Sequence, residues 1–381
     1  MGKKIFMLGG AGNMGSELTR GLLSFDEISV ITIGDTNMEA ADRLAKELND
    51  PRVNTVYVDV TDVKDATEKV KGYDMLMNAT YFAFFDYALQ VACDAKVTYA
   101  DLASSPTAEQ REMVAKAGIT VMTGLGITPG LTNILAKYGT EQMDETDEIH
   151  IHFASFRTLA PSKGLLETII WELATECPTR MYYLNGSFNS VPPLQGSKTV
   201  NFAEPLGPQV VYYVPHPETV SLSQNIPGIK YVSVRGTWRP QDMIDFGVLN
   251  RFGLLDPVEV EVGGNKVLVS DVTKERIWQK FGGKFDKNLW AFFINIEIIG
   301  KKDGKRKTIT VNVSHPVEWM EKTTAKLTGI PAAVCTALMA RHGSSKPGIL
   351  YPEEYFSGTE FADEMKNKFP QIIIETVTTV E

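Results

Sequence analysis

Cysteine is scarce in this chain of 381 residues, and no apolar run approaches the length of a membrane span. The three cysteines are far apart and form no Cys-x-x-Cys pair, so they indicate neither a zinc knuckle nor a disulfide framework. They are Cys93, Cys177 and Cys335. The apolar stretch at residues 5–8 is too short for a signal peptide. We therefore expect a protein of the reducing cytoplasm that has no membrane as a partner.

The chain also lacks an excess of basic residues. It has 38 Lys and Arg against 47 Asp and Glu, a formal net charge of −9, which argues against nucleic acid as a partner. A hydrophobic fraction of 43% is enough to form a core, and no segment has the composition of a disordered one. The length favours two domains.

The most informative stretch is residues 5–15, where a short apolar strand runs directly into Gly10-x-Gly12-x-x-Gly15. This spacing is typical of dinucleotide-binding folds, in which a pyrophosphate lies on the N-terminus of the following helix. We expect Gly10 to permit the tight turn, Gly12 to let the backbone approach the pyrophosphate, and Gly15 to let helix and strand pack closely. Asn13 and Met14 complete the expected cofactor-binding loop. The alternative is a glycine turn that binds no ligand.

An acidic residue follows the second expected strand, at residues 28–33. Asp35 lies twenty residues after Gly15, where a carboxylate accepts hydrogen bonds from the adenosine ribose hydroxyls. We expect Thr36 to contact the cofactor as well. A carboxylate at Asp35 repels a 2′-phosphate, and the first cation after it is Arg43. The sequence therefore favours NAD over NADP, with NADP left open because Arg43 or a distant loop could neutralise a phosphate.

Strand and helix patterns alternate through about residue 130, with further strands expected at 53–58, 75–79, 97–100 and 120–123. This alternation predicts an α/β fold whose N-terminal Rossmann domain holds a doubly wound parallel sheet. After residue 145 alternating strands and hairpins predict a second, α+β domain with a mostly antiparallel mixed sheet. We expect the Rossmann domain at residues 1–130, the second domain at 131–325, and a helical segment at 326–381 that returns to the first domain.

The ends of the later strands supply further candidate residues, because ligands of parallel sheets bind outside the carboxyl ends of the strands. Asp59 either contacts the adenine or caps a helix. An aromatic cluster at residues 81–85 follows the fourth strand, and we expect most of its rings to pack in the core. The expected cofactor contacts here are Asp59, Val60, Asn78, Ala79, Thr80, Gly126 and Pro129. Thr80 and Tyr81 are the expected substrate contacts.

Several motifs together resemble the saccharopine dehydrogenase-like superfamily, and within it the chain most resembles lysine 6-dehydrogenase. The motifs are the N-terminal Gly-Gly-Ala-Gly-Asn-Met-Gly, Asp35, Tyr99-Ala-Asp101, Gly126-x-x-Pro129-Gly130-Leu-Thr-Asn133, His216-Pro-Glu218 and Gly236-Thr-Trp-Arg239. The resemblance covers almost the whole chain. Saccharopine reductases usually carry a cation after the second strand, and its absence here counts against saccharopine or carboxynorspermidine chemistry.

The resemblance implies an NAD(P)-dependent oxidoreductase acting at a carbon–nitrogen bond of an amino acid or amine. It implies oxidative deamination of lysine, with secondary-amine chemistry of the saccharopine or carboxynorspermidine type as the alternative. It also implies that residues 131–325 bind the substrate and form a homodimer. A non-catalytic NAD-binding sensor is the alternative of another class.

Such a reaction needs a proton-handling group and a cation for the substrate carboxylate. Asp101 is the first candidate acid or base, because it ends a predicted parallel strand; a helix cap or loop hydrogen bond is its alternative role. His216 is the second, since its ordinary pKa suits acid–base work, although a His before Pro also serves structure. Arg239 is the candidate carboxylate clamp, with an ion pair as the alternative.

No metal site is expected. His150 and His152 share one face of a predicted strand, but no third ligand stands at metal-site spacing.

Overall fold

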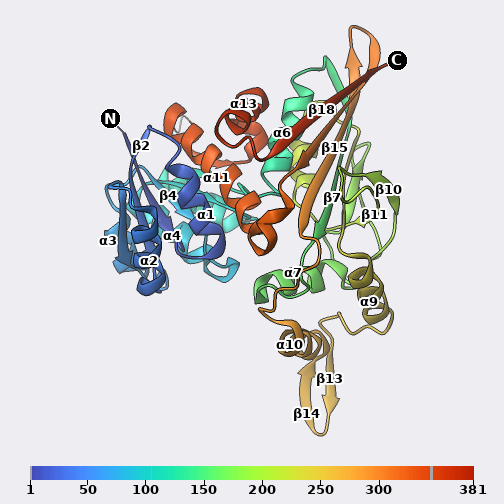
Figure 1. Cartoon of the computed structure of the whole chain (residues 1–381), viewed down its shortest axis with the longest axis horizontal. Helices are drawn as coiled ribbons and strands as arrows, with labels where there is room; N and C mark the ends of the chain where they lie inside the picture. Colours follow the sequence, from blue (N-terminus) through green and yellow to red (C-terminus); the bar gives the residue numbers. More distant parts are fainter. Residues whose placement is uncertain (1, 104, 344–345) are drawn as a thin grey trace. The chain divides into compact units, whose positions relative to one another are not determined.

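The computed structural model describes residues 2–103, 105–343 and 346–381 (Figure 1). The chain divides into two compact units, and each contains two stretches of sequence. The first unit comprises Met1–Tyr138 and Thr324–Pro370, and the second comprises Gly139–Thr323 and Gln371–Glu381. The division therefore lies eight residues after the expected one near 130, and the last eleven residues belong to the second unit.

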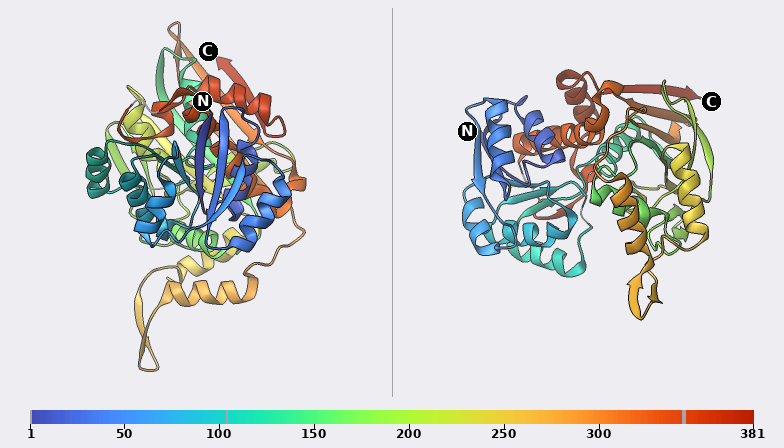
Figure 2. Two further views of the ribbon diagram at one scale, coloured as in Figure 1. Left: turned by 90° about the vertical axis from the view of Figure 1, so that its left-hand side faces the viewer. Right: turned by 60° about the horizontal axis from the view of Figure 1, so that its bottom comes forward.

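The first unit contains a seven-stranded sheet whose paired strands all run parallel, in the order β17-β6-β5-β4-β1-β2-β3. Its strands are β1 (Lys3–Leu8), β2 (Ile28–Asp35), β3 (Val53–Tyr57), β4 (Met75–Asn78), β5 (Thr98–Asp101), β6 (Thr120–Met122) and β17 (Gly348–Leu350). The order reverses between β1 and β4, which is the switch point of a Rossmann fold, where ligands bind. The predicted doubly wound parallel sheet is confirmed, and Figure 2 shows its blue strands side by side.

Helices connect these strands. They are α1 (Asn13–Leu22), α2 (Met38–Leu48), α3 (Val63–Val70), η1 (Phe82–Phe84), α4 (Phe85–Ala95), α5 (Ala108–Ala117), α6 (Leu131–Thr140), α11 (Thr323–His342), α12 (Pro352–Tyr355) and α13 (Gly358–Lys368). Local side chains define where several of them begin. Asn37 caps α2 by accepting a hydrogen bond from the Ala40 N–H, and Thr107 and Gln110 form a reciprocal capping box at the start of α5.

The second unit is built on a nine-stranded sheet, with the order β10-β11-β12-β7-β15-β16-β18 and with β8 and β9 attached to β12. Its strands are β7 (Glu145–Phe156), β8 (Met181–Leu184), β9 (Ser187–Ser190), β10 (Lys198–Asn201), β11 (Pro208–Tyr213), β12 (Tyr231–Thr237), β15 (Ala291–Lys302), β16 (Lys305–Ser314) and β18 (Ile373–Val380). Only β12 and β7 pair in parallel, so the sheet is mostly antiparallel and mixed, as predicted.

The other elements of the second unit include a separate hairpin, β13 (Glu259–Val262) and β14 (Asn265–Leu268), at the predicted position. The helices are α7 (Lys163–Leu173), α8 (Glu218–Asn225), α9 (Pro240–Arg251), α10 (Val269–Phe281) and η2 (Val317–Lys322). No helix within the described ranges combines the length and hydropathy needed to cross a bilayer.

Two strands near the C-terminus differ from expectation. β17 adds a seventh strand beside β6, and the sequence did not predict it because it is only three residues long. β18 pairs antiparallel with β16 in the second unit, so the expected helical segment at 326–381 ends as a strand. The β-branched run at 372–380 is typical of a strand, and it was a signal that could have shown this.

Candidate functional site

The glycine loop joins β1 to α1, and close backbone approaches explain its glycines. A Cβ on Gly15 would overlap the Gly9 carbonyl oxygen and lie 2.8 Å from the Gly10 Cα. Gly9, with φ of +71°, makes the tight turn that was expected at Gly10. Gly10 is instead buried, and its Cβ would lie 2.9 Å from the Met7 Cβ. The expected role of Gly10 is therefore corrected to close packing against β1.

The space above Gly12 fits a phosphate group. Within 4 Å, a Cβ on Gly12 would meet only the Gly9 carbonyl oxygen, which would lie 3.2 Å away. Gly12 is also the N-cap of α1, so no side chain caps the first N–H groups of the helix, at Asn13 and Met14. Exposed helix N–H groups and the positive end of the helix dipole together make an anion-binding position. These residues would hold the pyrophosphate of a dinucleotide.

Asp35 ends β2 beside this loop. Its Oδ2 accepts a hydrogen bond from the Ala11 N–H (3.2 Å), and its Oδ1 accepts one from the Asn37 N–H (2.9 Å). These bonds hold the carboxylate against the glycine loop, where it would bind the ribose hydroxyls. Thr36 is exposed next to it. Arg43, the nearest following cation, pairs with Glu39 one helical turn earlier (3.6 Å).

The residues after β3 differ partly from expectation. Asp62 caps α3 by accepting a hydrogen bond from the Asp65 N–H, so the helix-cap alternative for Asp59 is wrong. Asp59 accepts hydrogen bonds from the Thr61 hydroxyl (2.7 Å) and N–H (2.9 Å), and these lower its pKa. The side chain of Val60 is buried in the core. Contact of these residues with the adenine stays a prediction.

Asn78, at the end of β4, is fully buried and organises the neighbouring strand ends. Its Nδ2 donates to the Tyr99 hydroxyl (3.0 Å), and its Oδ1 accepts from the Thr80 N–H (3.0 Å) and hydroxyl (2.7 Å). A Cβ on Gly9 would lie 3.0 Å from Thr80, so Thr80 borders the glycine loop. Asn78 thus fixes the shape of the Ala79–Thr80 turn, which directly follows β4 and borders the glycine loop.

Asp101, the first candidate acid or base, is buried at the end of β5. Its Oδ1 accepts hydrogen bonds from the Thr123 hydroxyl (3.1 Å) and from the N–H groups of Gly124 (3.2 Å) and Ala103 (3.1 Å). Burial and then the charge of Asp101 raise the pKa of Tyr99 well above its ordinary value. A buried carboxylate with this many donors is well suited to joining β5 to β6. Its proton-handling role stays a prediction.

The turn at Gly126 and Pro129 is held by its own backbone. The Thr128–Pro129 peptide bond is cis, and Gly130 has φ of +125°, with its nearest neighbours in the backbone of Gly126. The Gly130 N–H donates to the Asn133 side chain (3.0 Å) at the start of α6. The helix begins at Leu131, as predicted.

The aromatic cluster after β4 does not pack in the core as expected. Tyr81 is 41% exposed and Phe82 is 58% exposed, and Phe84 and Tyr87 are also exposed. Short strands and the 3-10 turn η1 place these rings at the carboxyl edge of the sheet, where solvent reaches them.

In the second unit, His216 lies between two buried carboxylates. Its Nδ1 is 3.4 Å from the Glu218 Oε2, and its Nε2 is 3.8 Å from the Glu172 Oε1. Burial opposes the charged form of His216, but the charges of Glu218 and Glu172 overcome burial and raise its pKa. Burial also raises the pKa of Glu172 to about 7. Sequence reasoning missed Glu172, which lies 44 positions before His216 in the chain.

Arg239, the candidate carboxylate clamp, already has a carboxylate partner. Its guanidinium binds Asp286 in bidentate fashion (2.6 and 3.1 Å) and donates to the Leu289 carbonyl (3.0 Å). Arg157 is buried, and its charge interacts with those of Glu172 and Arg239. The hydrogen bonds of the Arg157 guanidinium go to the backbone carbonyls of Thr158, Leu159 and Leu165.

The two strand histidines bind neighbouring side chains. His150 bonds to Ser233 (2.8 Å) and Glu148 (2.9 Å), and His152 bonds to Asn295 (3.0 Å). Burial lowers the pKa of both imidazoles. Within the described ranges, no group of three His, Cys, Asp or Glu side chains has the arrangement of a metal site.

Comparison with known proteins identifies the family of both units. Residues 5–122 match the saccharopine dehydrogenase NADP binding domain, and residues 126–371 match the saccharopine dehydrogenase C-terminal domain. Carboxyaminopropylagmatine dehydrogenase from Synechocystis sp. is 24% identical over 384 residues, covering 91% of this chain and 92% of the relative. Carboxynorspermidine synthase from Vibrio alginolyticus is 26% identical over 268 residues, covering 64% of this chain and 60% of the relative.

Two solved structures share the fold. Saccharopine dehydrogenase (L-Glu forming) from Saccharomyces cerevisiae superposes with a TM-score of 0.73 at 17% identity, over 99% of this chain and all of the other. Homospermidine synthase from Legionella pneumophila, solved in complex with NAD, gives a TM-score of 0.58 at 12% identity, over 99% and 91% of the two chains. The first unit is therefore an NAD(P)-binding domain, and the chain belongs to the saccharopine dehydrogenase family of NAD(P)-dependent oxidoreductases.

Proposed function

We propose that this protein forms or cleaves a secondary amine, using NAD(P)H or NAD(P)+ as the hydride carrier. The observation that carries the proposal is the glycine loop with Asp35, in a chain that matches the saccharopine dehydrogenase family over both units. The compounds in the names of the relatives, carboxyaminopropylagmatine and carboxynorspermidine, are both secondary amines. These relatives favour secondary-amine chemistry, although the absence of a cation directly after Asp35 counted against it.

In the reductive direction, a primary amine and an aldehyde condense to an imine with loss of water. When bound, NAD(P)H supplies the hydride that reduces the imine carbon, and one proton completes the secondary amine. The reverse reaction releases the same amine and aldehyde and takes up one water. The protein must bind both substrates, exclude bulk water and move the protons.

His216 is the proton-handling residue that the local geometry supports best. The two carboxylates beside it raise its pKa above the ordinary value of an imidazole and so favour its protonated form, which can donate a proton. Asp101 is the second choice, because its oxygen atoms already accept several hydrogen bonds. Arg239 would hold the substrate carboxylate alongside its bond to Asp286, and Thr80 and Tyr81 would contact the substrate.

NAD is the proposed cofactor in preference to NADP, because Asp35 carries a negative charge and Arg43 pairs with Glu39. Oxidation of lysine at its side-chain amine stays a prediction, since the relatives described above bear on the family and not specifically on lysine 6-dehydrogenase. Nothing in these comparisons favours the alternative of a non-catalytic sensor.

The test is a coupling assay that follows the absorbance of NADH or NADPH at 340 nm. Aspartate semialdehyde is the aldehyde, because reductive coupling of its carbonyl leaves a carboxyaminopropyl group on nitrogen. Agmatine and 1,3-diaminopropane are the amines. The proposal requires cofactor oxidation only when both substrates are present, and mass spectrometry identifies the product. Oxidation of NADH by the aldehyde alone contradicts it.

We also propose a homodimer in the cytoplasm. The hairpin β13–β14 pairs with neither large sheet, and isolated two-stranded hairpins are marginally stable in water. Val258, Val260 and Val262 on this hairpin are exposed, and α10 beside it has no buried residue. A second copy of this chain would cover this apolar surface.

The buried, unpaired thiols of the three cysteines favour a reducing compartment.

A further inference from the structure

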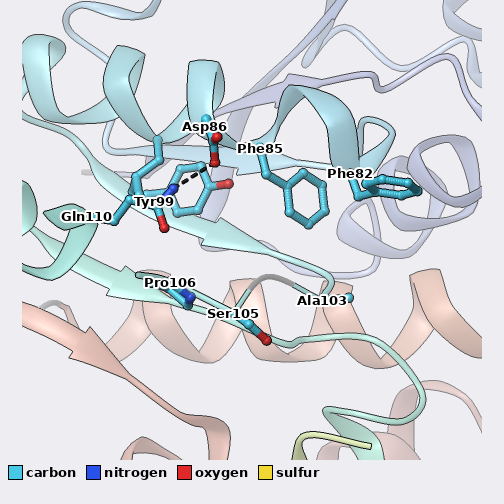
Figure 3. A pocket seen from close by; sticks show the side chains of 9 residues that line it. Phe82, Phe85, Asp86, Tyr99, Ala103, Ser105, Pro106 and Gln110 are labelled. Atoms are coloured by element: carbon cyan, nitrogen blue, oxygen red, sulfur yellow. Dashed lines mark hydrogen bonds between the residues drawn. The ribbon is translucent and has the colours of Figure 1, made fainter. Parts of the chain in front are cut away.

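A cavity of about 240 Å³ lies at the carboxyl edge of the parallel sheet in the first unit. Its walls come from η1 and the first turns of α4, from β5, from α5, and from Ala103, Ser105 and Pro106. Figure 3 shows Asp86 hydrogen-bonded to Gln110 on one side, with the Phe85 ring next to them and the Phe82 ring farther along the cavity. We call this space the Asp86 cavity. By volume it could hold roughly eight water molecules, so a short alkyl chain with one charged end fits.

The Asp86 cavity adjoins the expected cofactor position through a chain of hydrogen bonds. Tyr99 forms part of its wall and accepts a hydrogen bond from Asn78 (3.0 Å), which in turn holds Thr80. Thr80 borders the glycine loop at Gly9. The Asp86 cavity and the expected cofactor position are therefore connected by one hydrogen-bonded network of side chains at the carboxyl ends of β4 and β5.

The lining has the chemistry of a cation site. Asp86 supplies a carboxylate whose Oδ1 accepts a hydrogen bond from the Gln110 Nε2 (2.7 Å). No lysine, arginine or histidine in the described parts of the chain forms an ion pair with Asp86, and none is among the residues that line the cavity. The faces of aromatic rings attract ammonium and guanidinium groups. Phe82 and Phe85 offer such faces next to an unneutralised carboxylate.

We propose that the Asp86 cavity binds the far, cationic end of the amine substrate. The ligand class is an alkyl chain that ends in an ammonium or guanidinium group, as in a diamine or agmatine. The inference rests on the proposed function, which identifies the amine group that reacts. It adds that the Asp86 cavity selects substrates that carry a second positive charge. A neutral-tailed amine of similar length gains neither the ion pair nor the contact with the rings.

Binding measurements test the cavity without turnover. Isothermal titration with agmatine and with 1,3-diaminopropane, in the presence of saturating NAD+, gives the affinity for the full-length protein. Asp86→Asn keeps the size of the side chain and removes its charge; because Asp86 is exposed, we expect it to weaken binding of both probes by up to about fivefold. Phe85→Leu should weaken binding roughly threefold by removing a ring face.

Asp94→Asn is the matched control, because Asp94 lies on the same helix and also accepts a hydrogen bond from a glutamine, Gln90 (2.8 Å). It should leave the affinity for the probes unchanged. NADH affinity, measured by fluorescence, should be the same in all three variants and in the wild type. A loss of NADH affinity in Asp86→Asn would overturn the proposal by assigning the cavity to the nicotinamide.

The coupling assay then separates failure of this inference from failure of the proposed function. With turnover, Asp86→Asn should raise the KM for 1,3-diaminopropane by up to about fivefold and leave the KM for n-butylamine unchanged. Equal changes for both amines would overturn the cation site. If the wild type couples neither amine yet binds them through Asp86, the proposed reaction fails and the cation site stands. If the wild type binds neither probe, the cation site fails.

Discussion

Alanine at either of two glycines of the same loop should weaken cofactor binding, but only one of the two substitutions should also destabilise the fold. In Gly12→Ala the new methyl group meets only the Gly9 carbonyl oxygen, at 3.2 Å, so the loop accommodates it. The cost to unfolding should stay below about 1 kcal/mol, the typical cost of alanine at an N-cap. The same methyl group occupies the space of the pyrophosphate and separates it from the helix N–H groups. Losing one or two charge-assisted hydrogen bonds costs about 3 kcal/mol, a decrease in affinity of roughly a hundredfold.

In Gly15→Ala the methyl group overlaps the Gly9 carbonyl oxygen and approaches the Gly10 Cα, which are backbone atoms that cannot rotate away. Helix α1 must then move relative to β1, at a cost of about 3 kcal/mol or more. We therefore expect Gly15→Ala to lose both stability and cofactor affinity.

Thermal denaturation and fluorescence titration with NADH measure the two quantities separately. Gly247→Ala is the control, because its Cβ would meet only a Leu194 methyl group at 3.5 Å. It should leave NADH affinity unchanged and should change the free energy of unfolding by no more than about 1 kcal/mol. Wild-type NADH affinity in Gly12→Ala would refute the assignment of the pyrophosphate to this loop, and so would a melting temperature as low as that of Gly15→Ala.

Four further predictions follow from named contacts. Asp35→Asn removes the charge that repels a 2′-phosphate, so the ratio of NADPH to NADH affinity should rise roughly tenfold; an unchanged ratio in titrations contradicts this role. Tyr99→Phe leaves the buried Asn78 Nδ2 without its acceptor and should cost about 2 kcal/mol in urea unfolding, whereas a cost below about 0.5 kcal/mol argues against the network. Burial raises the pKa of Glu172 to about 7, so the folded state binds a proton more tightly than the unfolded state and wild-type stability falls as pH rises from about 4.5 to 7. The free energy of unfolding of Glu172→Gln should therefore rise relative to that of the wild type by up to about 3 kcal/mol as pH increases over that range. A difference in stability between the two proteins that does not change with pH contradicts this prediction. Val262→Lys, at a position 62% exposed, should shift the dimer toward monomer in light scattering, and a dimer of unchanged strength contradicts the proposed interface.

The parts of the site that are local in sequence could be predicted. The glycine spacing and Asp35 depend on one strand, one turn and one helix, so they follow from a stretch of about thirty residues. The Ala11 N–H donates a hydrogen bond to Asp35 across 24 positions, so the acid lies against the glycine loop. The hairpin around Gly263 was predictable for the same reason, since its two strands are adjacent in the chain.

Contacts that depend on tertiary packing could not be predicted. Asn78 and Tyr99 meet because β4 and β5 are neighbours in the sheet, and nothing in the sequence between them indicates that bond. Arg239 and Asp286 lie 47 positions apart, so the carboxylate partner of Arg239 was invisible. The exposure of Phe82 was missed because an aromatic residue after a strand is usually buried, whereas here the strand is only four residues long.

The coupling reaction tests the central claim most directly. The purified protein is incubated with NADH, aspartate semialdehyde and agmatine, the absorbance at 340 nm is followed, and the product is identified by mass spectrometry. The account predicts NADH oxidation that requires both carbon substrates, with a product mass equal to the sum of the two minus one water plus two hydrogens. The absence of any coupled product from this mixture, with NAD+ reduction by lysine in a parallel incubation, would contradict the proposed secondary-amine chemistry.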